Sequence, residues 1–299
     1  MKRLVVFFAT LLLVSEFATA QSFYAKGRNR NVVASVGTGV SSYFGDLNNP
    51  GDLLDTRLNV NVGLQYLLGP RASIRGELTF FQLQGSDVEA SDEGRVARNL
   101  SFVSNNIEVN AVVIVNLLPN GLRFYQRFPI NPYAFAGLGF TYFEPRAERS
   151  NGEFQRLRPL QTEGNSYGPV TLVIPAGAGV KFKVSPFINI ALEGGFRFTF
   201  TDYLDDVSTV FVDNSSFTDP IAAELADRRP EIGLPLRPEG STRGNPDDND
   251  AYFVANVKLE YYLPGELFSF RKKYSRGRNS NSFFRGSGKR KRKRAKGGF

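Results

Sequence analysis

The stretch from residue 188 to residue 202 alternates between two kinds of side chain over its whole length. Successive side chains of a β-strand point to opposite faces, so this alternation predicts a strand. One face is apolar and aromatic, and it carries Ile188, Ile190, Leu192, Gly194, Phe196, Phe198 and Phe200. The other face carries charged and small residues, including Glu193 and Arg197. This pattern is typical of a strand with lipid on one side and a narrow polar barrel interior on the other.

Seven further segments repeat the pattern with varying clarity. They span 32–44, 58–68, 72–83, 105–118, 131–143, 170–184 and 251–263. The total of eight is even, as expected when both ends of a barrel lie on one side of the membrane. We therefore predict an all-β chain that folds as an eight-stranded antiparallel transmembrane β-barrel. A soluble barrel is the alternative.

The connections between these segments alternate in length. Those at 69–71, 119–130 and 185–187 are shorter, and those at 45–57, 84–104, 144–169 and 203–250 are longer and polar. Outer-membrane barrels have short periplasmic turns and long external loops, so both chain ends are expected in the periplasm. In the longest loop we expect a short helix near 221–225 and an exposed segment over 227–250.

The ends of the chain differ from the predicted barrel. Residues 1–20 combine a basic start, an apolar run and Ala18-Thr19-Ala20, which predicts a signal peptide cleaved before Gln21. The organisation we expect is a signal peptide at 1–20, a periplasmic segment at 21–31, the barrel at 32–265 and a flexible basic tail at 266–299. No later stretch approaches the roughly 20 apolar residues of a membrane-spanning helix. The cell outer membrane is the expected location.

The formal net charge of +8 conceals a strongly basic tail. Residues 271–299 hold thirteen Lys or Arg and no acid, and the signal peptide adds one positive charge, which leaves −6 on 21–270. The densest run comprises Lys289, Arg290, Lys291, Arg292, Lys293, Arg294 and Lys296. Such a run is typical of nucleic-acid binding in a cytosolic protein, but an exported protein is expected to have no nucleic-acid partner. The tail is either a solvated segment or a contact for an anionic periplasmic surface.

Charged residues recur on the face predicted to point into the barrel. They are Arg75, Glu77, Glu108, Lys181, Lys183, Glu193, Arg197, Lys258 and Glu260. Unpaired buried charges are very costly, so these groups do not suit the core of a soluble barrel. In an eight-stranded membrane barrel they can neutralise one another, and an interior of that size is filled by side chains. We therefore predict an interior charge network and no open channel.

Aromatic residues gather near the predicted strand ends. They are Tyr43, Phe44, Tyr66, Phe80, Tyr133, Tyr142, Phe143, Phe200, Tyr203, Tyr261 and Tyr262. Each alone is explained by ordinary packing. Together they predict aromatic belts at the two membrane interfaces.

The chain contains no His and no Cys, which excludes Ser-His and Cys-His nucleophile pairs and zinc sites built on those ligands. Carboxylate or Lys chemistry remains open to an enzyme. We expect no catalytic residue, no metal and no cofactor.

Two acidic segments are predicted to meet at one rim of the barrel. The first is Tyr43, Phe44, Gly45 and Asp46, and the second is Asp202, Tyr203, Leu204, Asp205 and Asp206. Carboxylates in such numbers could hold calcium, but Asp also favours loop starts for local reasons. We favour a structural cluster over a metal site.

These segments also carry a resemblance. With residues 36–47, 176–182 and 193–208, the chain resembles the PorG-like outer-membrane β-barrels of the Bacteroidota type IX secretion system over roughly 30–265. The resemblance implies an integral outer-membrane component, surrounded by outer-membrane lipid, that contacts periplasmic secretion-ring subunits and has no enzymatic activity. A surface-adhesion or structural barrel that acts through its external loops is the alternative, and a carboxylate-based enzyme is a third reading.

Overall fold

The computed structural model describes residues 30–48, 56–88, 90–120 and 124–264. Eight long strands dominate this part of the chain. They are β1 (Val32–Phe44), β2 (Arg57–Leu67), β3 (Ala72–Ser86), β4 (Ser101–Asn116), β5 (Ile130–Tyr142), β8 (Val170–Lys183), β9 (Ile188–Thr199) and β10 (Ala251–Tyr262).

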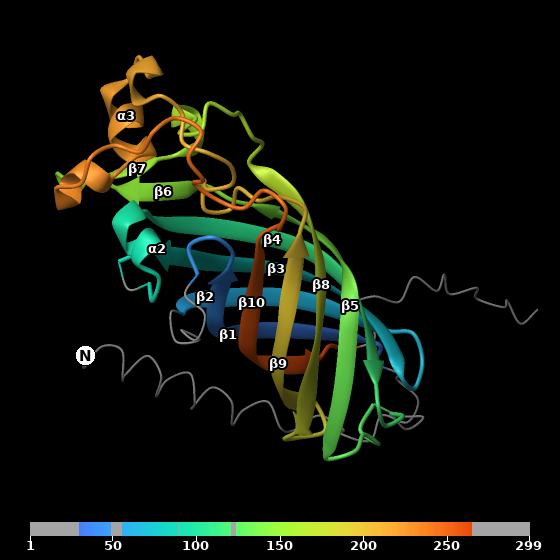
Figure 1. Cartoon of the computed structure of the whole chain (residues 1–299). Helices are drawn as coiled ribbons and strands as arrows, with labels where there is room; N and C mark the ends of the chain where they lie inside the picture. Colours follow the sequence, from blue (N-terminus) through green and yellow to red (C-terminus); the bar gives the residue numbers. More distant parts are fainter. Residues whose placement is uncertain (1–29, 49–55, 89, 121–123, 265–299) are drawn as a thin grey trace, which may run out of the picture. The chain divides into compact units, whose positions relative to one another are not determined.

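These eight strands form one closed antiparallel sheet. Each strand pairs with the next along the chain, β5 passes directly to β8, and β1 pairs with both β2 and β10. The closure leaves the barrel without a free edge, as seen in Figure 1. The predicted fold class, an all-β eight-stranded antiparallel barrel, is confirmed. None of the described helices is long and apolar enough to cross a membrane.

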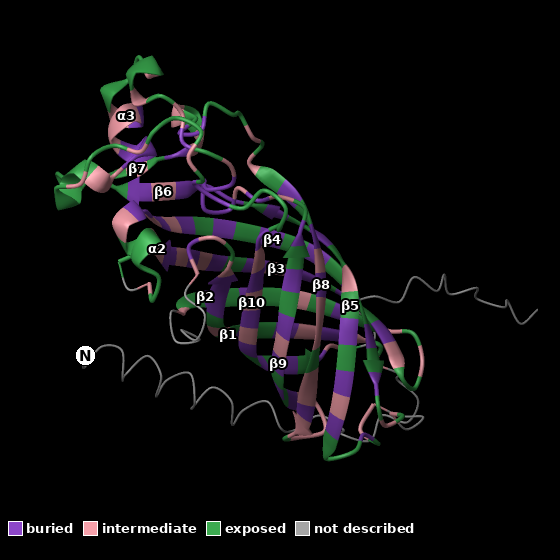
Figure 2. Cartoon of the chain, in the orientation of Figure 1, coloured by how far each residue is buried: buried purple, intermediate pink, exposed green. Residues whose placement is uncertain are grey.

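The barrel is apolar outside and polar inside. Along most of the strands, exposed and buried residues alternate (Figure 2). On β2, Val60, Val62 and Leu64 are exposed, while Asn59 and Asn61, which alternate with them, are buried. A soluble protein rarely exposes so large an apolar surface, whereas lipid requires one and requires a closed sheet as well. The protein is therefore an outer-membrane β-barrel.

Two strands run farther than their sequences predict. β3 and β4 continue as a paired ladder to Ser86 and Ser101, so the connection between them spans only 87–100. This connection contains helix α2 (Glu93–Arg98), which we did not predict. Polar residues such as Gln82 and Gln84 interrupt the apolar pattern where the strands leave the lipid. The backbone pairing does not depend on this pattern, so the ladder continues past them.

The predicted loop 144–169 also contains unexpected structure. It holds a hairpin of β6 (Pro145–Glu148) and β7 (Phe154–Arg156), attached to the extended end of β4, followed by the 3-10 turn η2 (Arg158–Leu160). These strands are too short for an alternating pattern to identify them.

The longest connection, 200–250, has three short helical segments. They are η3 (Asn214–Ser216), α3 (Pro220–Ala226) and η4 (Arg229–Ile232), so the expected helix near 221–225 is present. Asp219 begins α3 by accepting a hydrogen bond from the Ile221 amide. The expectation that 227–250 is simply exposed is wrong in part, because Asp227, Arg243 and Asp250 are buried.

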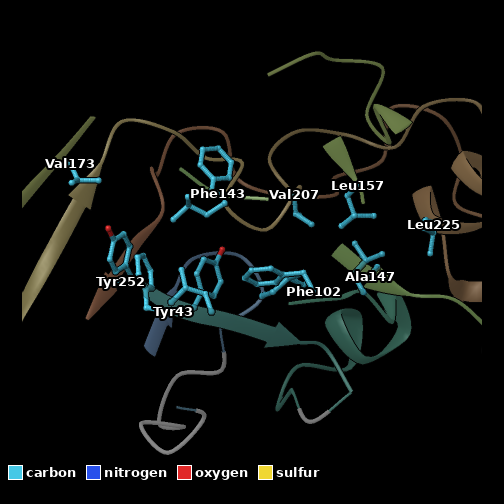
Figure 3. Close-up of a cluster of buried hydrophobic side chains, with 14 of the residues drawn as sticks. Tyr43, Phe102, Phe143, Ala147, Leu157, Val173, Val207, Leu225 and Tyr252 are labelled. Carbon is cyan, nitrogen blue, oxygen red and sulfur yellow. The ribbon is translucent and has the colours of Figure 1, made fainter. Parts of the chain in front are cut away.

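We call the described residues of the four long connections, 45–48, 87–100, 143–169 and 200–250, the loop cap. The cap and the strand ends beneath it share a hydrophobic core, shown in Figure 3. Its members are Tyr43, Leu47, Phe81, Leu83, Leu100, Phe102, Phe143, Ala147, Leu157, Val173, Leu204, Val207, Leu225, Tyr252 and Val254. The loops therefore fold as a packed layer over one end of the barrel.

Four of the aromatic residues expected at membrane interfaces lie elsewhere. Tyr43, Tyr133, Phe143 and Tyr262 are buried. The first two and Tyr262 occupy inward positions of their strands, and Phe143 belongs to the core of the cap. Position near a strand end does not by itself distinguish these inward or core side chains from side chains at a lipid interface.

Candidate functional site

A cluster of four ionised side chains fills the middle of the barrel. Arg75 of β3 makes a two-pronged contact with Glu193 of β9, at 2.7 and 2.8 Å. Lys258 of β10 lies 2.6 Å from Glu77 and 2.8 Å from the same Glu193. Tyr133 of β5 donates a further hydrogen bond to Glu193 at 2.7 Å. Strands from all around the barrel are thus joined through one carboxylate.

Two more ion pairs lie above and below this cluster. Lys181 contacts Glu260 at 2.7 Å, and Asn189 donates to the other oxygen of that carboxylate. Arg197 lies 3.6 Å from Glu108, whose oxygens also accept hydrogen bonds from Tyr252 and Asn110.

The remaining member of the predicted set is placed differently. Lys183 is only partly buried, and its ammonium group donates to the Tyr125 carbonyl at the short-turn end of the barrel. Without it, the eight buried residues comprise four cations and four anions, so their charges balance.

The consequence of this packing is a barrel that is sealed by side chains. Buried ion pairs offset their desolvation cost only when geometry is good and the remaining lone pairs are satisfied. At Glu193 the bidentate Arg75 contact and the added Lys258 and Tyr133 donors meet that requirement. Each of the four buried carboxylates contacts a cation.

The rim segments are brought together at the base of the loop cap. Tyr43 reaches Asp205 from the second segment and Asp250, which directly precedes β10. Phe44 points outward and packs against Phe196 at 5.6 Å between ring centroids. Gly45 passes so close to Asp250 that an added Cβ would lie 1.9 Å from its Oδ1.

The rim acids have separate partners instead of a common centre. Asp206 accepts hydrogen bonds from Thr162 and Tyr167, and Tyr203 stacks on Tyr167 at 4.7 Å. Leu204 is buried in the hydrophobic core. Among the residues that the structure describes, no group of three or more acidic side chains could hold a metal ion.

The electrostatics of these acids reflect their burial. Burial raises the pKa of Asp206 to about 6, although Arg243 opposes the shift. Burial, with neighbouring carboxylates such as Asp205, raises the pKa of Asp202 to about 8. For Asp46, burial also raises the pKa, while the Asn245 amide that donates to it lowers it.

Two arginines that the sequence did not indicate as functional, Arg98 and Arg243, hold the cap together. Arg98 of α2 contacts both oxygens of Asp87 and donates to the Asp46 and Arg243 carbonyls. Arg243 in turn pairs with Glu163 at 2.8 Å. All four long connections are thereby linked. Nothing in the local sequence distinguishes these arginines from solvent-exposed ones.

The basic-tail residues, Lys289, Arg290, Lys291, Arg292, Lys293, Arg294 and Lys296, lie outside the described residues, as do the predicted signal peptide and nearly all of segment 21–31.

Comparisons with solved structures return outer-membrane proteins at low identity. Neisserial surface protein A is 8% identical, with a TM-score of 0.39, over 80% of this chain and 100% of that one. The attachment invasion locus protein Ail of Yersinia pestis is 11% identical, with a TM-score of 0.37, over 78% and 98%. OprG from Pseudomonas aeruginosa is 8% identical, with a TM-score of 0.41, over 79% and 98%.

Among curated proteins, none matches the sequence. A family model does match: it is described as Domain of unknown function (DUF6089) and aligns with residues 7–218. Since these residues make up more than two thirds of the chain, the protein belongs to the DUF6089 family.

Proposed function

We propose that this protein is a non-enzymatic outer-membrane component of a protein-secretion assembly of the type IX class, and that it contacts periplasmic ring subunits. The specific assignment rests on the resemblance of segments 36–47 and 193–208 to PorG-like barrels. The barrel itself serves as the membrane anchor, with its short turns toward the periplasm.

The observation that carries this proposal is the sealed interior. Arg75 and Lys258 both contact Glu193 across the barrel, and an interior of eight strands is filled by such side chains, which leaves solutes no open path. A filled eight-stranded barrel acts through its ends, either by binding partners or by presenting a surface.

The charge of the tail supports a periplasmic partner. The basic tail at 271–299 supplies thirteen cations without a compensating acid, which favours an acidic protein surface or lipid phosphates as its contact.

Affinity purification from mildly solubilised membranes tests the proposal. The full chain is expected to retain ring subunits, and deletion of 271–299 is expected to weaken that retention in a salt-sensitive way. A matched control replaces the seven cations between 289 and 296 by Gln, which keeps the length and removes the charge. Absence of ring subunits from the full-chain sample contradicts the secretion role.

A surface-adhesion role is the second candidate, and the folded cap favours it. An open cleft of about 390 Å³ in the cap is lined by Arg95, Arg98, Arg237 and Arg243, together with acidic and polar residues. Exchange of the cap loops for short turns separates the two functions. An adhesin loses binding to its target, whereas a component bound from the periplasm keeps its ring subunits.

A further inference from the structure

The Tyr43 hydroxyl makes two short contacts that a single proton cannot supply. Its oxygen lies 2.7 Å from Oδ2 of Asp205 and 2.5 Å from Oδ1 of Asp250. A phenol has one O–H and donates one hydrogen bond along it. The second contact therefore needs a proton from one of the carboxyl groups, which then donates to the phenol oxygen.

We propose that Tyr43, Asp205 and Asp250 form a shared-proton triad that fastens both ends of the 200–250 connection to strand β1, and that loss of this proton at rising pH releases the connection. The proposal concerns the loop cap and does not depend on the secretion role.

The other oxygens of the two carboxyl groups bind the connection itself. Oδ2 of Asp250 accepts from the Leu204 amide at 2.8 Å, and Oδ1 of Asp205 accepts from the Val207 amide at 2.9 Å. The Asp250 amide donates to the Thr201 carbonyl at 3.0 Å. The start and the end of a fifty-residue connection thus meet at one tyrosine.

The triad is buried and tightly packed, so no cation from the solvent can take the place of its proton. Tyr43, Asp205 and Asp250 are all buried. Gly45 lies against them: an added Cβ would fall 2.0 Å from the Tyr43 oxygen, as well as against Asp250. Position 45 therefore requires a glycine, because the backbone there passes too close to the triad for a side chain to fit.

The charges that face the triad favour the extra proton. Asp46 and Asp202 add negative charge from the neighbouring segments, and the facing cation is Arg98. Arg98 is already bound to both oxygens of Asp87. Farther out, Glu163 and Asp206 share Arg243.

The pKa values agree with this arrangement. Burial raises the pKa of Asp205 to about 7 and raises that of Asp250 well above its ordinary range. Once the connection opens, the carboxyls return to ordinary Asp values near 4.

The sign of the pH effect follows from these values. Above about pH 4 the closed form still holds the shared proton while the open form has lost it, so opening releases this proton and becomes easier as the pH rises. This proton alone should raise the opening equilibrium about tenfold per pH unit until the closed form also loses it, and the buried Asp202 and Asp206 add to the slope.

Hydrogen exchange on the full chain in detergent micelles tests the triad. Protection factors, corrected for intrinsic exchange at each pH, are measured between pH 4.5 and pH 8 for peptides that cover 202–208. We expect the protection to fall as the pH rises, by at least about tenfold per pH unit in the lower part of this range. Peptides within β4 should show no such slope.

Two isosteric variants and one control sharpen the test. Asp205→Asn imitates the protonated acid, since its amide donates to Tyr43 while its oxygen still accepts from Val207. It should remove the triad's share of the slope, about a factor of ten per pH unit, and raise the protection at pH 8 above that of the wild type. Asp250→Asn should do the same, and Asp247→Asn, an exposed acid of the same connection, should leave the slope unchanged.

Three results would overturn the proposal. The first is a wild-type protein whose protection does not change with pH. The second is a slope that is as steep in both Asn variants as in the wild type. The third is protection that disappears on chelation and returns with calcium at constant pH, because the carboxyls would then hold a cation instead of a proton.

Discussion

At the scale of single residues, the interior depends on cations that serve more than one carboxylate. Lys258 is fully buried and contacts both Glu77 and Glu193, while Arg75 contacts the same two acids from the other side. Removing one partner of a buried pair costs more than the pair contributes, because a charge is left unpaired in a low dielectric.

Lys258→Met should therefore destabilise the barrel strongly. We expect the free energy of unfolding, measured by urea titration in micelles, to fall by about 3–5 kcal/mol. Lys183→Met is the matched control, since Lys183 is only partly buried and contacts a carbonyl, and it should cost much less. Equal effects of the two substitutions would contradict a cooperative interior cluster.

A second residue-scale prediction concerns Gly45. In Gly45→Ala the new methyl group would overlap Asp250 and the Tyr43 hydroxyl, so we expect a loss of about 1–3 kcal/mol in stability. Gly69→Ala is the control, because nothing lies within 4 Å of a Cβ there. Thermal unfolding of both variants measures the difference in stability. A Gly45→Ala protein as stable as the control would show that the base of the cap is loosely packed.

At the scale of elements, Glu163 links two of the long connections that form the loop cap. Its carboxylate accepts hydrogen bonds from the Ser208 and Thr209 amides, from the Thr209 hydroxyl and from Arg243. One side chain of the 144–169 connection thus fixes the start and the later part of the 200–250 connection.

Glu163→Gln should loosen the cap and leave the barrel intact. The substitution keeps the shape but leaves Arg243 without its main counter-charge, so we expect local opening to become easier by about 3–5 kcal/mol. Limited proteolysis should then cut within 200–250 much faster than in wild type. Glu153→Gln, whose side chain is largely exposed, should behave like wild type, and slow cutting in both variants would argue against this role.

At the scale of the whole molecule, lipid outside and ion pairs inside give a closed membrane anchor. We expect no single-channel conductance in planar bilayers, because the four cations and four anions of the interior occupy its cross-section. A variant that lacks 203–249 should stay equally silent, since the block lies in the barrel and not in the cap. Discrete conductance steps in wild type would contradict this account.

Much of the barrel is predictable from the sequence because its physics is local. Strand alternation has a period of two residues, and lipid outside with charges inside makes the two faces of 188–199 unmistakable. The charged residues of the interior are predictable for the same reason. The cap is not, because segments such as 145–148 are too short for a pattern and Arg98 looks like any surface arginine.

The sequence by itself determined the number of barrel strands and, for the clearly alternating ones such as 188–199, which face meets lipid, since both follow from neighbours along the chain. Only the tertiary structure decided which cation meets which carboxylate, that Tyr43 points inward, and that Asp205 and Asp250 meet on it. These contacts join residues up to 207 positions apart, and their partners are chosen by the closure of the sheet and the packing of the cap. No local periodicity encodes that choice.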